Sequence, residues 1–183
     1  MVEKIENIEN NILVCIATPN DVVGIQEVFY RTWLATYPNE EAGITVDDIE
    51  DRYKDRLNEK NISKRKEQII NPLDGQTLFV AKDGERVVGL CRVVKKVDRN
   101  QLLAIYVLPE YQSRGIGSKL WEECKKIFDS SKDIYVEVAT YNSNAIAFYK
   151  KLGFVETGRR FTDEKTRMKS GSVIPEMEMM IKV

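Results

Sequence analysis

The sequence contains no histidine, the side chain that most often acts as a general base or metal ligand near neutral pH. Its absence excludes every serine or cysteine triad that depends on an imidazole. If the protein is an enzyme that moves protons near pH 7, carboxylates, tyrosine, a thiol or water must carry them.

A strong net charge is missing as well, because 28 lysines and arginines stand against 29 acidic residues, a formal charge of −1. Nucleic-acid binders usually show a clear basic excess, so no nucleic-acid partner is expected. No apolar run approaches the roughly 18 residues of a membrane span. Residues 1–11 are polar and acidic, unlike a secretory signal. We therefore expect a cytoplasmic protein that does not bind membranes.

Cysteine is scarce and dispersed: Cys15, Cys91 and Cys124 are odd in number and lie far apart. Neither a disulfide framework nor a metal-ligand spacing emerges, so we expect reduced, mostly buried thiols and no metal. The chain has 183 residues, 43% of them hydrophobic, which is enough for one core. No linker or repeat divides it, and a single domain over residues 1–183 is expected.

The apolar periodicity predicts strands mixed with helices. Strands are expected at residues 12–17, 77–82, 86–97, 101–108, 133–140, 154–161 and 175–183. Helices are expected after Thr18 as far as about Tyr37, and at residues 45–60, 115–129 and 142–153, with a short helix or a loop at 61–75. Asp83-Gly84 predicts a type I′ hairpin turn. Hairpins followed by βαβ units imply one mixed sheet covered by helices.

The segment EYQSRGIGS (110–118) places two glycines one residue apart between an apolar strand and an amphipathic helix. A dinucleotide fingerprint fails because Leu120 stands where the third glycine is required. A phosphate loop of the NTPase type fails because Gln112 stands where its first glycine is required. Two interpretations remain: a pyrophosphate held by N–H groups at a helix N-terminus, or only a tight turn.

Two motifs in order resemble the GNAT superfamily of N-acetyltransferases, over about residues 77–161 and more loosely in the N-terminal helices. The first, Q/R-x-x-G-x-G/A, is matched by Gln112, Gly115 and Gly117. The second, N-x-x-A-x-x-x-Y-x-x-x-G-F, is matched by Asn142, Ala145, Tyr149, Gly153 and Phe154. The resemblance implies an α/β (α+β) fold: a mixed, mostly antiparallel β-sheet with helices on both faces. It also implies acetyl-CoA as co-substrate, with its diphosphate in the glycine loop.

The resemblance carries over a set of cofactor-binding residues. These are Ile105, Tyr106 and Val107 beside the pantetheine arm, the loop residues Gln112, Ser113, Arg114, Gly115, Ile116, Gly117 and Ser118, and also Asn142 and Tyr149. The N–H of Val107 would polarise the thioester carbonyl. Asn142 would bond the pantetheine or a water, and a plain helix cap is its alternative role.

The two proton transfers of amine acetylation point to two catalytic candidates. Tyr149 would protonate the departing thiolate, as the resemblance implies; packing beside Phe148 is the alternative. Glu137 would serve as the base, because alternation puts it with Tyr135 and Ala139 on one face of an otherwise apolar strand. An acid there is costly to bury without a role; a salt bridge or a solvent-facing position is the alternative.

The stretch RTWLATYPNEE (31–41) resembles PaiA-type spermidine/spermine N-acetyltransferases. Trp33, Tyr37, Glu40 and Glu41 are therefore predicted to contact a small-molecule amine, a polyamine above others. The alternatives are a solvated amphipathic helix, the commoner explanation of such a run of acids, and core packing for Trp33 and Tyr37. A protein N-terminal or lysine acetyltransferase and a non-catalytic acyl-CoA-binding regulator remain open, as does the oligomeric state, a homodimer included.

Overall fold

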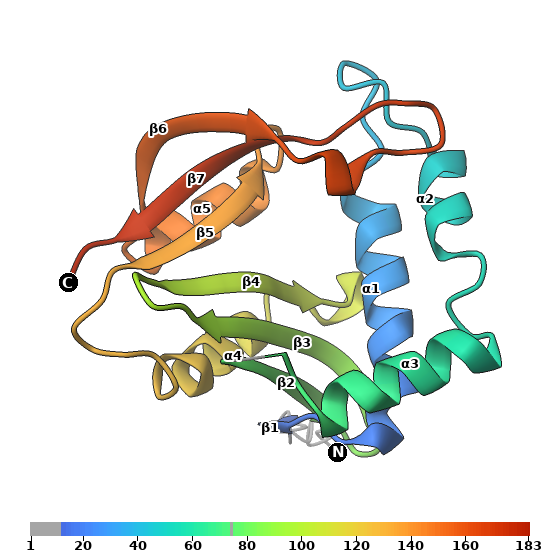
Figure 1. The fold of residues 1–183 in the computed structure, drawn as a ribbon, viewed down its shortest axis with the longest axis horizontal. Helices are drawn as coiled ribbons and strands as arrows, with labels where there is room; N and C mark the ends of the chain where they lie inside the picture. Colours follow the sequence, from blue (N-terminus) through green and yellow to red (C-terminus); the bar gives the residue numbers. More distant parts are fainter. Residues whose placement is uncertain (1–11, 74) are drawn as a thin grey trace, which may run out of the picture.

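A single mixed sheet organises the chain in the computed structural model, which describes residues 12–73 and 75–183 (Figure 1). The expectation of no secretory signal at 1–11 concerns residues outside this range. The described sheet has seven strands in the order β1-β2-β3-β4-β5-β7-β6. Their bounds are β1 Ile12–Ile16, β2 Gln76–Asp83, β3 Arg86–Lys95, β4 Asn100–Val107, β5 Ile134–Ala139, β6 Val155–Thr162 and β7 Pro175–Ile181.

Among the described pairs, only β4 and β5 run parallel, so the predicted mixed, mostly antiparallel sheet is confirmed. Helices cover both faces: α1 (Val22–Thr36), α2 (Val46–Tyr53) and α3 (Glu59–Ile70), and opposite them α4 (Ile116–Lys125) and α5 (Ser143–Lys151). Two paired strands show that the two groups of helices cover different faces of the sheet. Tyr106 of β4 packs on Phe29 of α1, whereas Cys91 of β3 lies beside Cys124 of α4.

The predicted start of the first helix is confirmed, with a short 3₁₀ turn (Pro19–Asp21) leading into α1. Asp21 accepts hydrogen bonds from the backbone N–H and the hydroxyl of Thr18, at 2.8 and 2.9 Å. Lys82 of β2 pairs with the same carboxylate at 2.6 Å, which fastens the helix start to the sheet. These contacts hold the pKa of Asp21 below its usual value although burial opposes them.

Two predicted helix boundaries and one predicted turn type were wrong. The helix expected over 45–60 ends at Tyr53, and α3 begins at Glu59, because the side chain of Asn58 accepts the N–H of Asn61 at 2.8 Å and caps a new helix. α4 stops at Lys125 rather than near residue 129. The β2–β3 turn comprises Gly84 and Glu85, and only Gly84 has a positive φ (+57°), a type II′ pattern instead of type I′.

The cysteines agree with the sequence: Cys91 and Cys124 are buried, Cys15 is partly exposed, and all are free. Over residues 12–73 and 75–183, no helix is long and apolar enough to cross a bilayer. The same residues hold no cluster of three or more Cys, Asp or Glu side chains suited to a metal ion.

Candidate active site

The sheet opens between β4 and β5. These two strands pair only where Asn100–Leu102 lie beside Ile134–Val136, and beyond that point they diverge (Figure 1). On either side the pairing continues, since β3 follows β4 as far as Val107 and β7 follows β5 as far as Ala139. A register shift in the β3–β4 ladder leaves Leu103 as an extra residue, and such a bulge bends its strand. The carboxyl-terminal halves of β4 and β5 therefore border a gap.

The backbone of β4 offers hydrogen-bond donors to this gap. The N–H of Leu108 donates to Val88 of β3 at 2.9 Å. Because successive N–H groups of an extended strand point to opposite sides, the N–H of Val107 points away from β3, towards the gap. The same alternation directs the N–H of Ile105 to the gap. The predicted pantetheine-binding residues thus lie on the open edge of a strand.

The glycine loop delivers further N–H groups to the end of β4. Ser113 and Gly115 have φ of +61° and +77°, and α4 begins at Ile116 without a side-chain cap. Among the described residues, the N–H groups of 113–118 find no acceptor. Gln112 holds the loop in place by donating from Nε2 to the carbonyl of Val107 at 3.1 Å. Unpaired donors at the positive end of a helix dipole suit an anion.

Glycine is needed at positions 115 and 117 of the loop for different physical reasons. At Gly115 a Cβ would meet nothing within 4 Å, so glycine is required for its left-handed conformation. At Gly117 a Cβ would lie 3.2 Å from Cζ of Phe148 in α5. This close approach of α4 to α5 was not foreseen from the sequence, which gives no sign of the partner ring.

Tyr149 lies in α5, which covers the sheet face opposite α1. Its side chain is 6% exposed and packs against the rings of Phe148 and Phe154, with centroids 5.7 and 5.6 Å away. Its hydroxyl has no partner among the described residues, and burial raises its pKa well above the usual value. The hydroxyl is therefore protonated at neutral pH. Asn142 caps α5 by accepting the N–H of Ala145 at 3.1 Å, as its alternative role required.

Aromatic residues from the end of α1, from β4 and from the turn before α5 meet on the sheet face that α1 covers. The hydroxyl oxygens of Tyr37 and Tyr106 are 3.1 Å apart, and the Tyr141 hydroxyl donates to the carbonyl of Tyr37 at 2.9 Å. The rings of Trp33 and Tyr37 contact each other, with centroids 4.4 Å apart and an interplanar angle of 45°, and the indole nitrogen of Trp33 is buried. The structure thus brings Trp33 and Tyr37, two predicted acceptor residues, next to the cofactor-side residue Tyr106.

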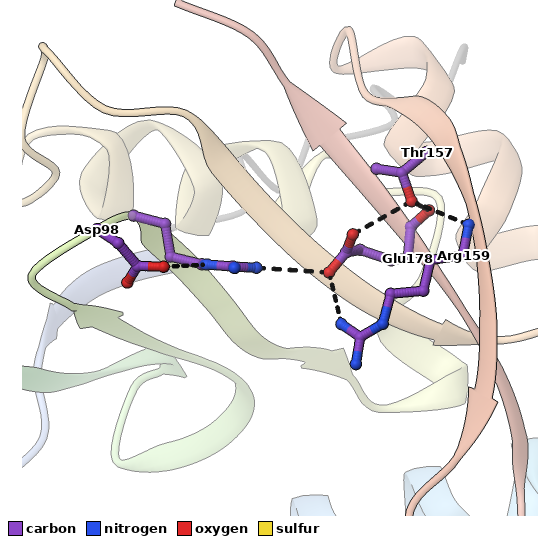
Figure 2. A network of polar contacts seen from close by, with 5 residues as sticks. Asp98, Thr157, Arg159 and Glu178 are labelled. Atoms are coloured by element: carbon purple, nitrogen blue, oxygen red, sulfur yellow. Dashed lines mark hydrogen bonds and ion pairs between the residues drawn. The ribbon is translucent and has the colours of Figure 1, made fainter.

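Three glutamates project from β5 and β7 on this same face: Glu137, Glu176 and Glu178. Glu178 is 6% exposed and satisfied, because Arg159 and Arg99 approach its carboxylate at 3.0 and 3.5 Å (Figure 2). Thr157 donates to the same carboxylate at 3.2 Å. Glu178 therefore has a structural role.

Glu137 and Glu176 have no ion pair or hydrogen bond with any side chain in the described part of the chain. The surrounding protein displaces part of the water from the carboxylate of Glu137 and so raises its pKa, although the side chain still reaches solvent. Burial, followed by the charges of Glu137 and Asp163, raises the pKa of Glu176 to about 7. Glu176 was missed from the sequence, although an acid in the alternating strand PEMEMMI carries the same signal that singled out Glu137.

Glu176 faces the gap and its aromatic residues. It pairs with Ala139 at the open end of β5, beyond the last β4–β5 contact. Its charge is among the causes that raise the pKa of Tyr37, Tyr106 and Tyr141, the last to about 12. A half-buried carboxylate thus lies across the gap from the β4 edge.

Glu40 and Glu41 lie farther out. Both side chains are exposed in the turn between α1 and α2, where Asn39 and Ile44 form an isolated bridge. The hydroxyl of Ser172 donates to the carbonyl of Gly43 at 2.8 Å, which ties this turn to the segment that leads into β7. The structure does not bring the two acids into contact with Trp33 or Tyr37.

Comparison with known proteins agrees with this geometry. The family model described as acetyltransferase (GNAT) family matches residues 29–154. The PaiA N-acetyltransferase of Thermoplasma acidophilum, solved with coenzyme A, has a TM-score of 0.73 at 20% identity and covers 94% of this chain and 99% of its own. The chimera of the Vibrio cholerae spermidine N-acetyltransferase SpeG has a TM-score of 0.58 at 20% identity, covering 93% and 94%.

Curated relatives match over shorter stretches. The N-alpha-acetyltransferase of Sulfurisphaera tokodaii is 38% identical over 63 residues, 33% of this chain and 38% of that protein. The N-alpha-acetyltransferase 30 of Schizosaccharomyces pombe is 29% identical over 45% of this chain and 60% of its own. The match thus spans less than two thirds of either relative. Because the family model covers more than half of the chain, the protein belongs to the acetyltransferase (GNAT) family.

Proposed function

We propose that the chain transfers the acetyl group of acetyl-CoA to a primary amine by direct attack within a ternary complex. The observation that carries the proposal is the gap between β4 and β5. It is bordered by free backbone donors on one edge and by Glu176, a carboxylate without a partner among the described residues, on the other. Family membership supports the same chemistry.

In this proposal the cofactor lies along β4 and the loop that follows. The N–H groups of residues 113–118 would hold its diphosphate, and the pantetheine amides would pair with the open edge at residues 105–107, as an added strand does. The N–H of Val107 would donate to the thioester carbonyl, whose oxygen gains negative charge when the amine attacks. Such a donor stabilises the transition state more than the ground state.

The proposal assigns an acid from α5 and a base from β7. A primary amine with a pKa of about 10.4 arrives protonated, so it must lose a proton before it attacks. Glu176, with a pKa raised to about 7, would accept that proton. Glu137 helps to keep this pKa high and is the alternative base predicted from the sequence. Tyr149 would give its hydroxyl proton to the thiolate of coenzyme A as the thioester breaks.

The acceptor is proposed to be a polyamine. Glu137 and Glu176 lie on one face of the sheet, and the exposed Glu40 and Glu41, here called the rim acids, lie in a turn that Ser172 ties to the segment leading into β7. A polyamine, whose ammonium groups are spaced along an alkyl chain, would interact with both pairs of acids. The similarity to PaiA and to the SpeG chimera supports this choice. A second candidate is the N-terminus of a protein, because two curated relatives are named N-alpha-acetyltransferases.

Turnover on a panel of amines tests the proposal. Release of free coenzyme A would be followed with spermidine, spermine, a monoamine, amino acids, aminoglycosides and peptides with a free N-terminus or a lysine. The proposal expects the highest kcat/KM for a polyamine. A peptide preference would favour the second candidate, and tight binding of acetyl-CoA without turnover on any amine would favour a non-catalytic acyl-CoA-binding regulator.

The loop assignment is tested by Gly115→Ala. A Cβ at φ +77° forces the loop to relax and misaligns the N–H groups of 113–118. We expect the Kd for acetyl-CoA to rise on the order of tenfold, because about 1.4 kcal/mol of lost interaction has that effect. Calorimetric titration measures it. The matched control is Gly84→Ala, which has the same strain and open space in the β2–β3 turn; equal Kd values in both variants would contradict the assignment.

The rim acids are tested by reversing the charge of Glu40 and Glu41 together. Both are exposed, so their effect on a cation is long-range and screened by salt over roughly 8 Å at physiological ionic strength. We expect KM to rise several-fold for spermidine, which carries about three charges at neutral pH, and far less for a monoamine. Steady-state kinetics at two salt concentrations measures the difference. Equal KM changes for both amines would show that Glu40 and Glu41 do not select a polyamine.

A further inference from the structure

A polar cavity of about 290 Å³ lies between α1, α3 and β3. Its lining is unusual in charge, because it comprises three cations and three amides and no acid: Gln26, Asn61, Lys64, Arg65, Gln68 and Arg92. It lies on the face opposite to α4, since Arg92 follows Cys91 in β3 and Cys91 faces Cys124 of α4. The cavity is therefore separate from the loop proposed to bind the cofactor.

The two arginines of this cavity have no carboxylate partner. Arg56, close by, forms an ion pair with Glu27 at 3.6 Å, although its Nε is buried without an acceptor. Arg65 lies over the ring of Phe29 at 5.4 Å from its centroid, and Nε of Arg92 is buried without an acceptor; neither arginine pairs with an acid among residues 12–73 and 75–183. Burial and the nearby charge of Arg92 lower the pKa of Arg65. Two cations held near each other with an unsatisfied donor are unfavourable unless an anion joins them.

We propose that this cavity binds a small oxyanion, a phosphate ester or a carboxylate, through Arg65 and Arg92. Guanidinium groups present paired donors that match two oxygens of such an anion. Lys64 adds charge at the rim, and the amides of Asn61 and Gln68 suit a polar ligand body. The volume, about 290 Å³, lies at the lower end of ligand sites, which begin at about 300 Å³, and suits a small ligand.

Calorimetric titration with inorganic phosphate tests the proposal. The protein is first saturated with coenzyme A, so that the glycine loop is occupied, and chloride keeps the ionic strength constant. We expect one phosphate per chain, and an affinity lower by on the order of ten- to a hundredfold in Arg65→Gln and in Arg92→Gln, because each removes a charge-assisted pair. Lys66→Gln is the matched control: it makes the same charge change on an exposed residue of α3.

Thermal unfolding separates binding from damage to the fold. In phosphate-free buffer Arg92→Gln should melt no lower than the wild type, because the substitution removes one of two neighbouring cations. With the protein again saturated with coenzyme A, added phosphate should raise the melting temperature of the wild type and of Lys66→Gln, and much less that of the arginine variants. Absence of phosphate binding to the coenzyme A-loaded wild type, or equal affinity in Arg65→Gln and Lys66→Gln, would overturn the proposal.

Discussion

A Glu176→Gln variant is expected to acetylate its amine on the order of a hundred- to ten-thousandfold more slowly than the wild type, the usual contribution of a general base. Glutamine keeps the size of the side chain and a hydrogen-bonding oxygen but accepts no proton near neutral pH. The effect should fall on kcat/KM for the amine, while the Kd for acetyl-CoA stays unchanged because the residue faces the acceptor side of the gap.

The pH dependence gives the same prediction a second readout. A pKa of about 7 for Glu176 means that the base is protonated and inactive in more acidic solution. The profile of kcat/KM in the wild type should therefore fall below about pH 7, and this limb should be absent in Glu176→Gln. An unchanged limb in the variant would assign it to another group, Glu137 first, and Glu137→Gln tests that alternative directly.

Glu176→Gln is expected to lower activity but to raise the thermal stability of the protein at high pH. Because the folded pKa of Glu176 is raised, its ionised form is less favourable in the folded than in the unfolded protein. The carboxyl therefore contributes most to stability below its unfolded pKa of about 4.5 and loses that contribution as the pH rises through about 7. Glu176→Gln should melt higher than the wild type at pH 8 and show no such advantage at pH 4.

Glu178→Gln is the control for both effects, since it makes the same change on the same strand and face. Glu178 is held by Arg99, Arg159 and Thr157 (Figure 2), so its neutralisation removes ion pairs from a buried acid. We expect a lower melting temperature and nearly normal kcat in the fraction that stays folded. If Glu176→Gln behaved in this way, it too would be structural.

Tyr149→Phe is expected to lower kcat on the order of ten- to a thousandfold, because phenylalanine keeps the ring and removes only the proton donor. The Tyr149 hydroxyl has no partner among the described residues, so its removal leaves no unsatisfied group and stability should stay unchanged. Binding of acetyl-CoA should also be unchanged.

The matched control is Tyr141→Phe, which removes a hydroxyl that donates to the carbonyl of Tyr37. This variant should lose some stability through the aromatic residues near the gap, with a smaller effect on kcat. Steady-state kinetics and thermal melts of both variants distinguish the two roles. Full activity in Tyr149→Phe would return that residue to packing between Phe148 and Phe154.

The sequence predicted what local patterns determine. Alternation and capping located every described strand within two residues at each end, and the helix start at Thr18. The boundary at Asn58 was missed because one capping side chain competes with an amphipathic pattern that continues past it. The glycine loop was recognisable because its motif lies in consecutive residues.

What the sequence could not give depends on contacts between distant segments. Glu137 and Glu176 carry the same local signal, an acid in an apolar strand. Only the register of β5 with β7 shows that Glu176 lies opposite Ala139 at the open end, whereas Glu137 lies opposite Glu178. The contact of Gly117 with Phe148 likewise appears only when α4 and α5 are packed together.

Rapid mixing in a single turnover tests the central claim most directly. Enzyme loaded with acetyl-CoA labelled in the acetyl group is mixed with spermidine, and quenched samples are analysed for acetylated amine, free coenzyme A and labelled protein. Direct attack in the gap between β4 and β5 requires acetylated amine and coenzyme A to appear at one rate, with no label on the protein. Release of coenzyme A before the acetylated amine, with label on the chain, would contradict the account.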